Sequence, residues 1–147
     1  SSVPSTIYQQ YVKGHHVVLS HAHTYDVLSK AELALVTSGT ATLETALFGV
    51  PQVVCYKGST LSIWLARKLV KIKYISLVNL ILDQKAVPEL IQDECTALLM
   101  QKEIEKLLPG QEHRSAQLAS YATLQLFLKQ SGVSERIANS MNSFIVP

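Results

Sequence analysis

The stretch Leu33–Tyr56, LALVTSGTATLETALFGVPQVVCY, decides the fold. Its two ends, Leu33–Val36 and Gln52–Tyr56, are short apolar runs, which are typical of parallel strands covered on both faces. Between them, Ala41–Phe48 has the composition of a helix and is followed by Gly49, a common helix stop. We therefore predict a strand–helix–strand unit with parallel strands.

The rest of the chain extends this pattern. Further strands are predicted over residues 16–19 and 74–77, and helices over 24–31, 61–71, 88–92, 96–108, 112–129 and 134–144. This order predicts an α/β fold, a Rossmann-like parallel sheet with flanking helices and a helical C-terminal segment. We expect a single domain over residues 1–147, with the α/β core over 1–93 and the helical segment over 94–147.

Composition excludes several classes of protein. Apolar residues make up 48% and charged residues 16% of the 147 residues, which argues against intrinsic disorder. The longest stretch without a charged residue, Ser115–Leu128, has 14 residues, short of the roughly 20 that span a bilayer. A net charge of +2 is too small to indicate nucleic-acid binding. Cys55 and Cys95 form no CxxC pair, so we expect a reducing compartment.

The junction Ser38-Gly39-Thr40 is the most informative candidate site. It joins a predicted buried strand to a helix, whose first N–H groups are unpaired and whose dipole is positive at that end. Gly39 permits close approach to the backbone, and the Ser38 and Thr40 hydroxyls can donate to phosphate oxygens. Glu44 lies one helical turn after Thr40 and could accept hydrogen bonds from a ribose diol. The alternative is that these residues only cap the helix, since Ser and Thr are ordinary caps.

Six segments form a combined pattern that is far more specific than its parts. They are SGTATLE (38–44), GVPQVV (49–54), YK (56–57), WLARKLVK (64–71), YISLVNL (74–80) and VPELIQD (87–93). Together they resemble the lipid-A-disaccharide synthase family over essentially the whole chain. The chain departs from the family pattern at Val78, where a proline is usual before the asparagine.

The resemblance implies the C-terminal, donor-binding half of a GT-B glycosyltransferase. The family transfers 2,3-diacylglucosamine from UDP to 2,3-diacylglucosamine 1-phosphate, which forms the lipid A disaccharide precursor and releases UDP. It implies a UDP-diacylglucosamine donor, a lipid acceptor and a bacterial cytoplasmic protein peripheral on the inner membrane. No cofactor and no metal is implied, and oligomerisation is left open.

The resemblance also implies roles for single residues. Ser38, Gly39 and Thr40 would hold the UDP phosphates, Glu44 the ribose, and Asn79 would lie near the donor sugar. The loop with Ser20 and His21 would flank the uracil. The general base is expected in the N-terminal half of the family's fold, so the catalytic residues are unknown here. We expect this chain alone to be inactive.

Other residues admit two interpretations each. Tyr56, after a strand, and Gln92 could reach the donor, or Tyr56 could be packing. The predicted helix 61–71 carries Trp64 within a basic arc, which suits either a membrane surface or a solvated face. The histidines at 15, 16, 21 and 23 are favoured as polar loop residues over metal ligands.

Two rival functions remain open. One is another GT-B enzyme that acts on UDP-sugars, such as a transferase of peptidoglycan synthesis or a UDP-sugar epimerase. The segments 64–71 and 74–80 argue against it, because those relatives lack this pairing. The other is a nucleotide-binding module without catalysis.

Overall fold

A computed structural model describes residues 4–20, 23–58 and 73–129. The chain divides into two compact units, residues 1–31 and residues 32–147. The first unit contains the helices α1 (Ser5–Val12) and α2 (Thr24–Leu28). The predicted helix over 24–31 is thus confirmed in a shorter form.

The predicted strand over residues 16–19 is wrong. This segment is irregular, and the side chain of Val18 is 90% exposed. A strand needs a neighbour for its backbone hydrogen bonds and a surface for its apolar face. The apolar run 16–19 has neither of these in the described part of the first unit.

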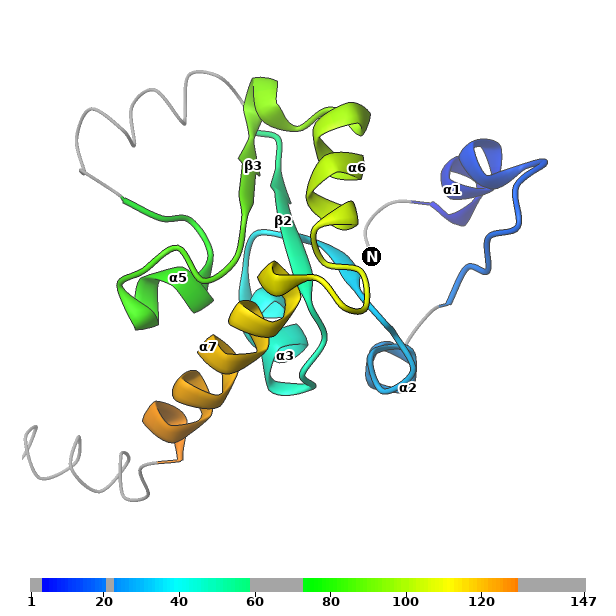
Figure 1. The fold of residues 1–147 in the computed structure, drawn as a ribbon. Coiled ribbons are helices and arrows are strands. Elements are labelled where there is room, and N and C mark those ends of the chain that lie inside the picture. Colours follow the sequence, from blue (N-terminus) through cyan, green and yellow to red (C-terminus); the bar gives the residue numbers. More distant parts are fainter. Residues whose placement is uncertain (1–3, 21–22, 59–72, 130–147) are drawn as a thin grey trace, which may run out of the picture. The chain divides into compact units, whose positions relative to one another are not determined.

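The second unit is built on a parallel sheet, which confirms the predicted α/β fold (Figure 1). Its described strands are β1 (Ala34–Thr37), β2 (Gln52–Tyr56) and β3 (Glu89–Ile91), in the spatial order β1-β2-β3. In the register, Leu35 is opposite Val53, and Cys55 is opposite both Thr37 and Leu90. β2 is therefore the central strand, with all three carboxyl ends at one edge.

Helices connect and flank these strands. They are α3 (Thr40–Leu47), α5 (Leu77–Leu82), the short 3-10 helix η1 (Gln92–Glu94), α6 (Ala97–Glu105) and α7 (Glu112–Leu128). The predicted strand 52–56 and the predicted helices 41–48, 96–108 and 112–129 are thereby confirmed within a few residues. The predicted helices 61–71 and 134–144 lie outside the described residues.

Two predicted elements, at residues 74–77 and 88–92, are of the wrong type. Residues 74–77 were expected as a strand, but this segment is irregular up to Ser76, which caps α5 by accepting a hydrogen bond from the Asn79 N–H. Residues 88–92 were expected as a helix, but Glu89–Ile91 form β3 instead. The Ile75 and Ser76 N–H groups donate to the Glu89 carboxylate and not to a neighbouring strand. Residues 89–91 form a strand because β2 is their parallel neighbour.

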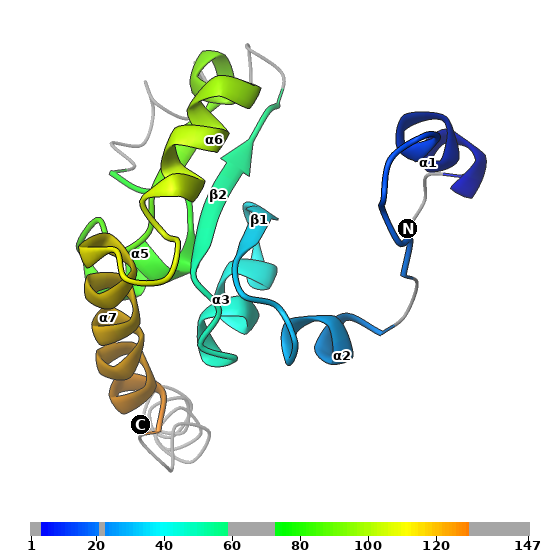
Figure 2. The same cartoon turned by 45° about the vertical axis from the view of Figure 1, so that its right-hand side comes forward.

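Helices cover both faces of the sheet. On one face Val54 is buried with Ala46 of α3, Val78 of α5 and Leu124 of α7. On the other, Val53, the next residue along β2, belongs to a second cluster with Leu90 and residues of or next to α6, including Leu107. This alternation follows from the period of two in a strand, and α6 lies beside β2 in Figures 1 and 2.

A buried polar cluster ties α7 to the start of β2. The side-chain amide of Gln117 accepts a hydrogen bond from the Gln52 N–H (2.7 Å) and donates one to the Gln52 carbonyl (3.1 Å). The Tyr121 hydroxyl donates to Gln117 Oε1 and accepts from Gln52 Nε2. Within the described residues, Gln52 Oε1 is a buried oxygen without a hydrogen-bond partner.

Candidate functional site

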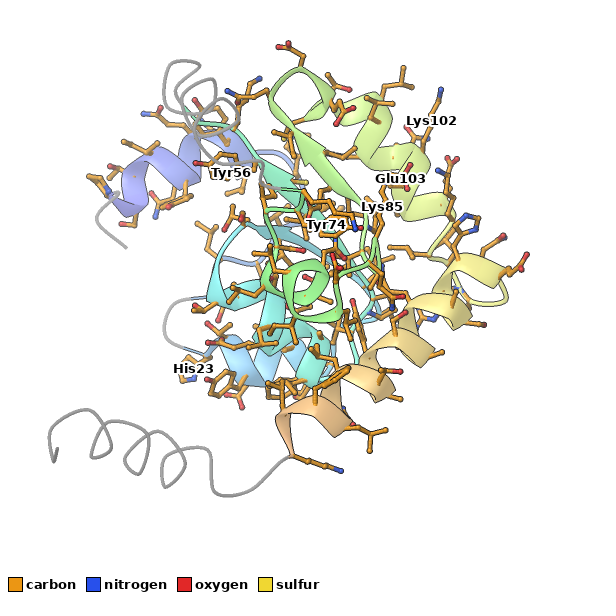
Figure 3. The ribbon with its side chains drawn as sticks, turned by 90° about the vertical axis from the view of Figure 1, so that its left-hand side faces the viewer. His23, Tyr56, Tyr74, Lys85, Lys102 and Glu103 are labelled. Atoms are coloured by element: carbon orange, nitrogen blue, oxygen red, sulfur yellow. The ribbon has the colours of Figure 1, made fainter. Side chains whose placement is uncertain are left out.

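The carboxyl edge of the sheet gathers several of the predicted site residues. Ser38 and Gly39 follow β1, Tyr56 ends β2, and Gln92 follows β3. Because the strands are parallel and adjacent, these segments lie at one edge. Tyr56 is labelled at this end of the central strand in Figure 3. Open parallel sheets bind ligands at this edge, so it is the candidate site.

Gly39 begins α3 with a backbone that favours glycine. Its φ is 142° and its ψ is −163°, and a Cβ atom built there would meet nothing within 4 Å. Its carbonyl accepts hydrogen bonds from both the N–H and the hydroxyl of Thr42, at 3.2 and 2.8 Å. The loop Ser38–Thr40 is here called the SGT loop. The hydrogen bonds from Thr42 hold it in place, and the space beside Gly39 where a side chain would lie is empty.

The two hydroxyls of the SGT loop differ. The Ser38 hydroxyl donates to the Ile75 carbonyl at 3.0 Å, so its proton is used within the protein. Thr40 is exposed, and its hydroxyl has no hydrogen-bond partner among the described residues. Of the two, Thr40 is therefore the one whose proton is available to a ligand.

Glu44 lies in the second turn of α3 and is half-buried. Its carboxylate makes no hydrogen bond or ion pair with any residue that the structure describes. A carboxylate that lacks a partner can accept two hydrogen bonds from neighbouring hydroxyls of a ligand. Glu44 is therefore able to accept hydrogen bonds from a ribose diol, and this role stays a prediction.

Asn79 was expected near the donor sugar, and the structure shows what its side chain contacts within the protein. It is fully buried in α5, and its Oδ1 accepts from the Val87 N–H while its Nδ2 donates to the Val87 carbonyl, both at 2.9 Å. The Nδ2 also donates to Glu89 Oε1 at 2.8 Å. These contacts make Asn79 a structural residue of the α5–β3 connection, and its predicted proximity to the sugar stays a prediction.

Glu89 is the residue of this region that sequence analysis missed. Its Oε1 accepts from the Ser76 N–H (2.9 Å), the Ser76 hydroxyl (2.7 Å) and Asn79 Nδ2 (2.8 Å), and Oε2 accepts from the Ile75 N–H (3.1 Å). The segment VPELIQD contains it, but its donors lie 10 to 14 residues earlier in the chain, so the sequence carries no local signal of its role.

Gln92 joins the ends of β2 and β3. Its Oε1 accepts from the Gly58 N–H and its Nε2 donates to the Gly58 carbonyl, both at 3.0 Å. The Tyr56 ring lies over Gly58, since a Cβ there would come within 2.9 Å of the Tyr56 hydroxyl oxygen. Both Gln92 amide groups are thus used internally, and Tyr56 is 36% exposed at the rim of the site.

The other predicted residues are less informative. Ser20 is an exposed residue of the first unit, and His21 lies outside the described residues, as does the basic segment around Trp64. In the described ranges, no group of three or more His, Cys, Asp or Glu side chains is arranged to hold a metal ion. No helix in that part of the chain is long and apolar enough to cross a membrane.

A separate cavity of about 380 Å³ lies near the amino ends of the strands. It is formed by the segment before β3, the end of α6 and α7, and it is lined by Lys85, Glu103, Lys106 and His113 among others. Lys85 and Glu103 are labelled in Figure 3. None of the predicted donor-binding residues lines it, so the candidate site and this cavity are distinct.

Cys55 of β2 and Cys95 after η1 are free thiols brought next to each other by the β2–β3 pairing. Burial, with a smaller effect of the neighbouring Cys95 thiol, raises the pKa of the Cys55 thiol to about 11. At neutral pH Cys55 is therefore protonated, which makes it a poor nucleophile.

The geometry defines an α/β protein with a parallel sheet. Its candidate ligand site lies at the carboxyl edge of that sheet, where the SGT loop leads into α3. Comparison with protein families gives a match over residues 4–142 to the model described as lipid-A-disaccharide synthetase. The chain belongs to this family. This confirms the resemblance inferred from the six motif segments.

Individual relatives agree with the family match. The chain is 37% identical over 125 residues to the lipid-A-disaccharide synthase of Geobacter metallireducens, which covers 85% of this chain and 33% of that protein. It is 31% identical over 144 residues to that of Sulfurihydrogenibium sp., covering 98% of this chain and 37% of the relative. With that of Hahella chejuensis it shares 44% over 99 residues, 67% of this chain and 25% of the relative. The chain spans about a third of the length of these relatives.

Proposed function

We propose that this chain forms the donor-binding part of a GT-B lipid-A-disaccharide synthase. The proposed reaction transfers 2,3-diacylglucosamine from UDP to 2,3-diacylglucosamine 1-phosphate, which forms the disaccharide precursor and UDP. The observation that carries the proposal is the SGT loop, which starts α3 at the carboxyl edge of the sheet with open space over Gly39. The family match over residues 4–142 supports it.

The UDP phosphates would bind at the N-terminus of α3. The first N–H groups of a helix have no intrahelical acceptor and the dipole is positive there, so a diphosphate is stabilised without a metal ion. Thr40, whose hydroxyl has no partner within the described ranges, can donate to a phosphate oxygen. Ser38 would contribute its backbone, because its hydroxyl is already donated to Ile75.

Glu44 would bind the ribose. It lies one turn after Thr40 on the same helix, so its carboxylate is displaced along α3 from the phosphate position. That separation limits repulsion between the carboxylate and the diphosphate. Tyr56, at the rim of the same edge, is proposed as a flanking contact of the donor.

The chain's own contribution to the reaction would be stabilisation of the leaving group. As the bond between sugar and UDP breaks, negative charge grows on the diphosphate, and fixed N–H dipoles at α3 stabilise it without reorganisation. Transfer also requires a base that takes the proton of the acceptor hydroxyl. No described residue is assigned that role.

The proposed partners follow from the substrates. A diacylglucosamine donor and acceptor carry acyl chains that partition into a bilayer, so the enzyme would work at the cytoplasmic surface of the bacterial inner membrane. The family membership supports this location at the coarse level of a bacterial lipid A enzyme.

Calorimetric titration with UDP tests the proposal. We expect the chain to bind UDP and Glu44→Ala to weaken binding about 10-fold, because the ribose diol loses a charged acceptor. Glu112→Ala removes an exposed carboxylate from the first turn of α7 and should leave the affinity unchanged. Wild-type binding with an unchanged affinity for Glu44→Ala would contradict the ribose assignment.

A further inference from the structure

One carboxylate organises the segment that precedes α5. Glu89 accepts four distinct donors, namely the N–H groups of Ile75 and Ser76, the Ser76 hydroxyl and Asn79 Nδ2. All of these distances lie between 2.7 and 3.2 Å. Each partner is a donor, so the group that fits is an ionised carboxylate, which only accepts.

The directions of the neighbouring hydrogen bonds are consistent with this arrangement. The Val87 N–H must donate to Asn79 Oδ1, which fixes the amide so that Nδ2 faces Glu89. The Ser76 hydroxyl donates to Glu89, and its oxygen accepts from the Asn79 N–H. A glutamine at position 89 would place an NH₂ group against one of these donors.

The same segment is joined to the candidate site by a hydrogen bond. The Ile75 N–H is held by Glu89, and the Ile75 carbonyl accepts the hydroxyl of Ser38 at 3.0 Å. Ser38 precedes Gly39, which has a positive φ and immediately precedes α3. A continuous chain of hydrogen bonds therefore runs from Glu89 through Ile75 to the SGT loop.

From this chain of contacts we propose that Glu89 is a positioning residue for diphosphate binding, acting through Ile75 and Ser38 on the SGT loop. The inference rests on the proposed function of that loop. The Ser38 hydroxyl then positions the loop and is not itself a phosphate ligand. The loop keeps Gly39 and the first N–H groups of α3 in the conformation that accepts a diphosphate.

Calorimetry with UDP on the 147-residue chain tests the proposal with four variants. Glu89→Gln disrupts the hydrogen bonds at the Glu89 end of this chain of contacts, and Ser38→Ala removes the one at the Ser38 end. The double variant does both. Glu94→Gln removes an exposed carboxylate from η1 on the same stretch and is the matched control. Thermal unfolding and the fitted number of sites report how much of each variant is folded.

We expect Glu89→Gln and Ser38→Ala each to weaken UDP binding about 10-fold at an unchanged number of sites. The double variant should bind no more weakly than the worse single variant, because the two residues act on one contact. Glu94→Gln should bind as the wild type. In ¹⁵N spectra, the Gly39 and Thr40 amide signals should shift in Glu89→Gln before any UDP is added.

Three results would overturn the inference while the proposed function stands. Glu89→Gln could bind UDP as the wild type, it could lose sites without a change in affinity, or the two single effects could multiply in the double variant. The second result would mean a role in folding alone, and the third would mean direct phosphate contact by Ser38. A wild-type chain that binds no UDP would overturn the proposed function itself.

Discussion

Gly39 has a backbone conformation that an L side chain adopts only with strain, at φ 142°. We expect Gly39→Ala to lower the free energy of unfolding by about 1–3 kcal/mol, the usual cost of such a conformation. The open space around the position means that strain, and not a clash, causes the loss. Urea unfolding followed by circular dichroism measures it.

The neighbouring Thr40→Ala is the control for this prediction. Its hydroxyl has no partner among the described residues, so the free energy of unfolding should change by less than about 0.5 kcal/mol. An equal loss of stability in both variants would show that the loop is generally sensitive and that the Gly39 conformation is not the cause.

Cys55 should be resistant to alkylation. Burial raises its pKa from 9.0 to about 11, which lowers the thiolate fraction at pH 8 about 100-fold. We expect iodoacetamide to modify Cys55 of the folded chain about 100-fold more slowly than Cys55 of the chain in urea, as followed by mass spectrometry of the peptide that carries Cys55. Equal rates in the two states would contradict the buried, protonated thiol.

The candidate ligand residues could be predicted from sequence where the signal is local. Gly39, Thr40 and Glu44 lie within one stretch of six residues, so helix-terminus chemistry and spacing suffice to select them. Glu89 could not be found in this way, since its donors at Ile75 and Ser76 are 14 and 13 residues away. The burial of Asn79 likewise depends on its bonds to Val87 and Glu89, which lie 8 and 10 residues further along the chain.

At the scale of elements, three amide side chains fix how strands and helices join. Each bonds both the N–H and the carbonyl of one residue: Asn79 with Val87, Gln92 with Gly58, and Gln117 with Gln52. Such a pair satisfies backbone groups that would otherwise be left without a strand neighbour. These side chains therefore bond the backbone at strand ends: Gln52 at the start of β2, Gly58 after β2 and Val87 before β3.

Gln117→Leu should be strongly destabilising. It keeps a similar volume but leaves the buried Gln52 N–H and the Tyr121 hydroxyl without an acceptor, so we expect a loss of about 2–4 kcal/mol. Gln125→Leu on the same helix is the control, because its side chain makes no hydrogen bond with the described residues. Chemical unfolding measures the free energy of unfolding of both variants. Similar values for the two would contradict a stabilising role of the Gln117 amide.

Most helices and strands could be predicted because their own residues carry the signal. β2 and α7 agree with the expected ranges almost residue for residue. The errors at 16–19, 74–77 and 88–92 have one cause. Short apolar segments become strands only where a neighbour supplies hydrogen bonds, and neighbours are set by tertiary contacts.

At the scale of the whole molecule, stability should fall in alkaline solution. Burial raises the pKa of Cys55 to about 11 and that of the Tyr121 hydroxyl above its ordinary range. The folded chain thus binds these protons more tightly than the unfolded chain. Their contribution to the free energy of unfolding is therefore complete below about pH 9 and declines as the pH rises toward 11.

Urea unfolding at pH 8, 9 and 10 measures this effect. We expect the free energy of unfolding to decrease over the series, and Tyr121→Phe to reduce the slope, since phenylalanine has no proton to lose. A free energy that stays constant up to pH 10 would contradict the burial of these two groups.

Within the described residues, two candidate places for a ligand are the SGT edge of the sheet and the cavity lined by Lys85 and His113 at the opposite ends of the strands. A UDP titration followed residue by residue in ¹⁵N spectra distinguishes them. Binding at the SGT edge predicts that the amides of Gly39, Thr40 and Ala41 shift most and saturate together. Saturating shifts confined to Lys85 and His113, or no shifts at all, would contradict it.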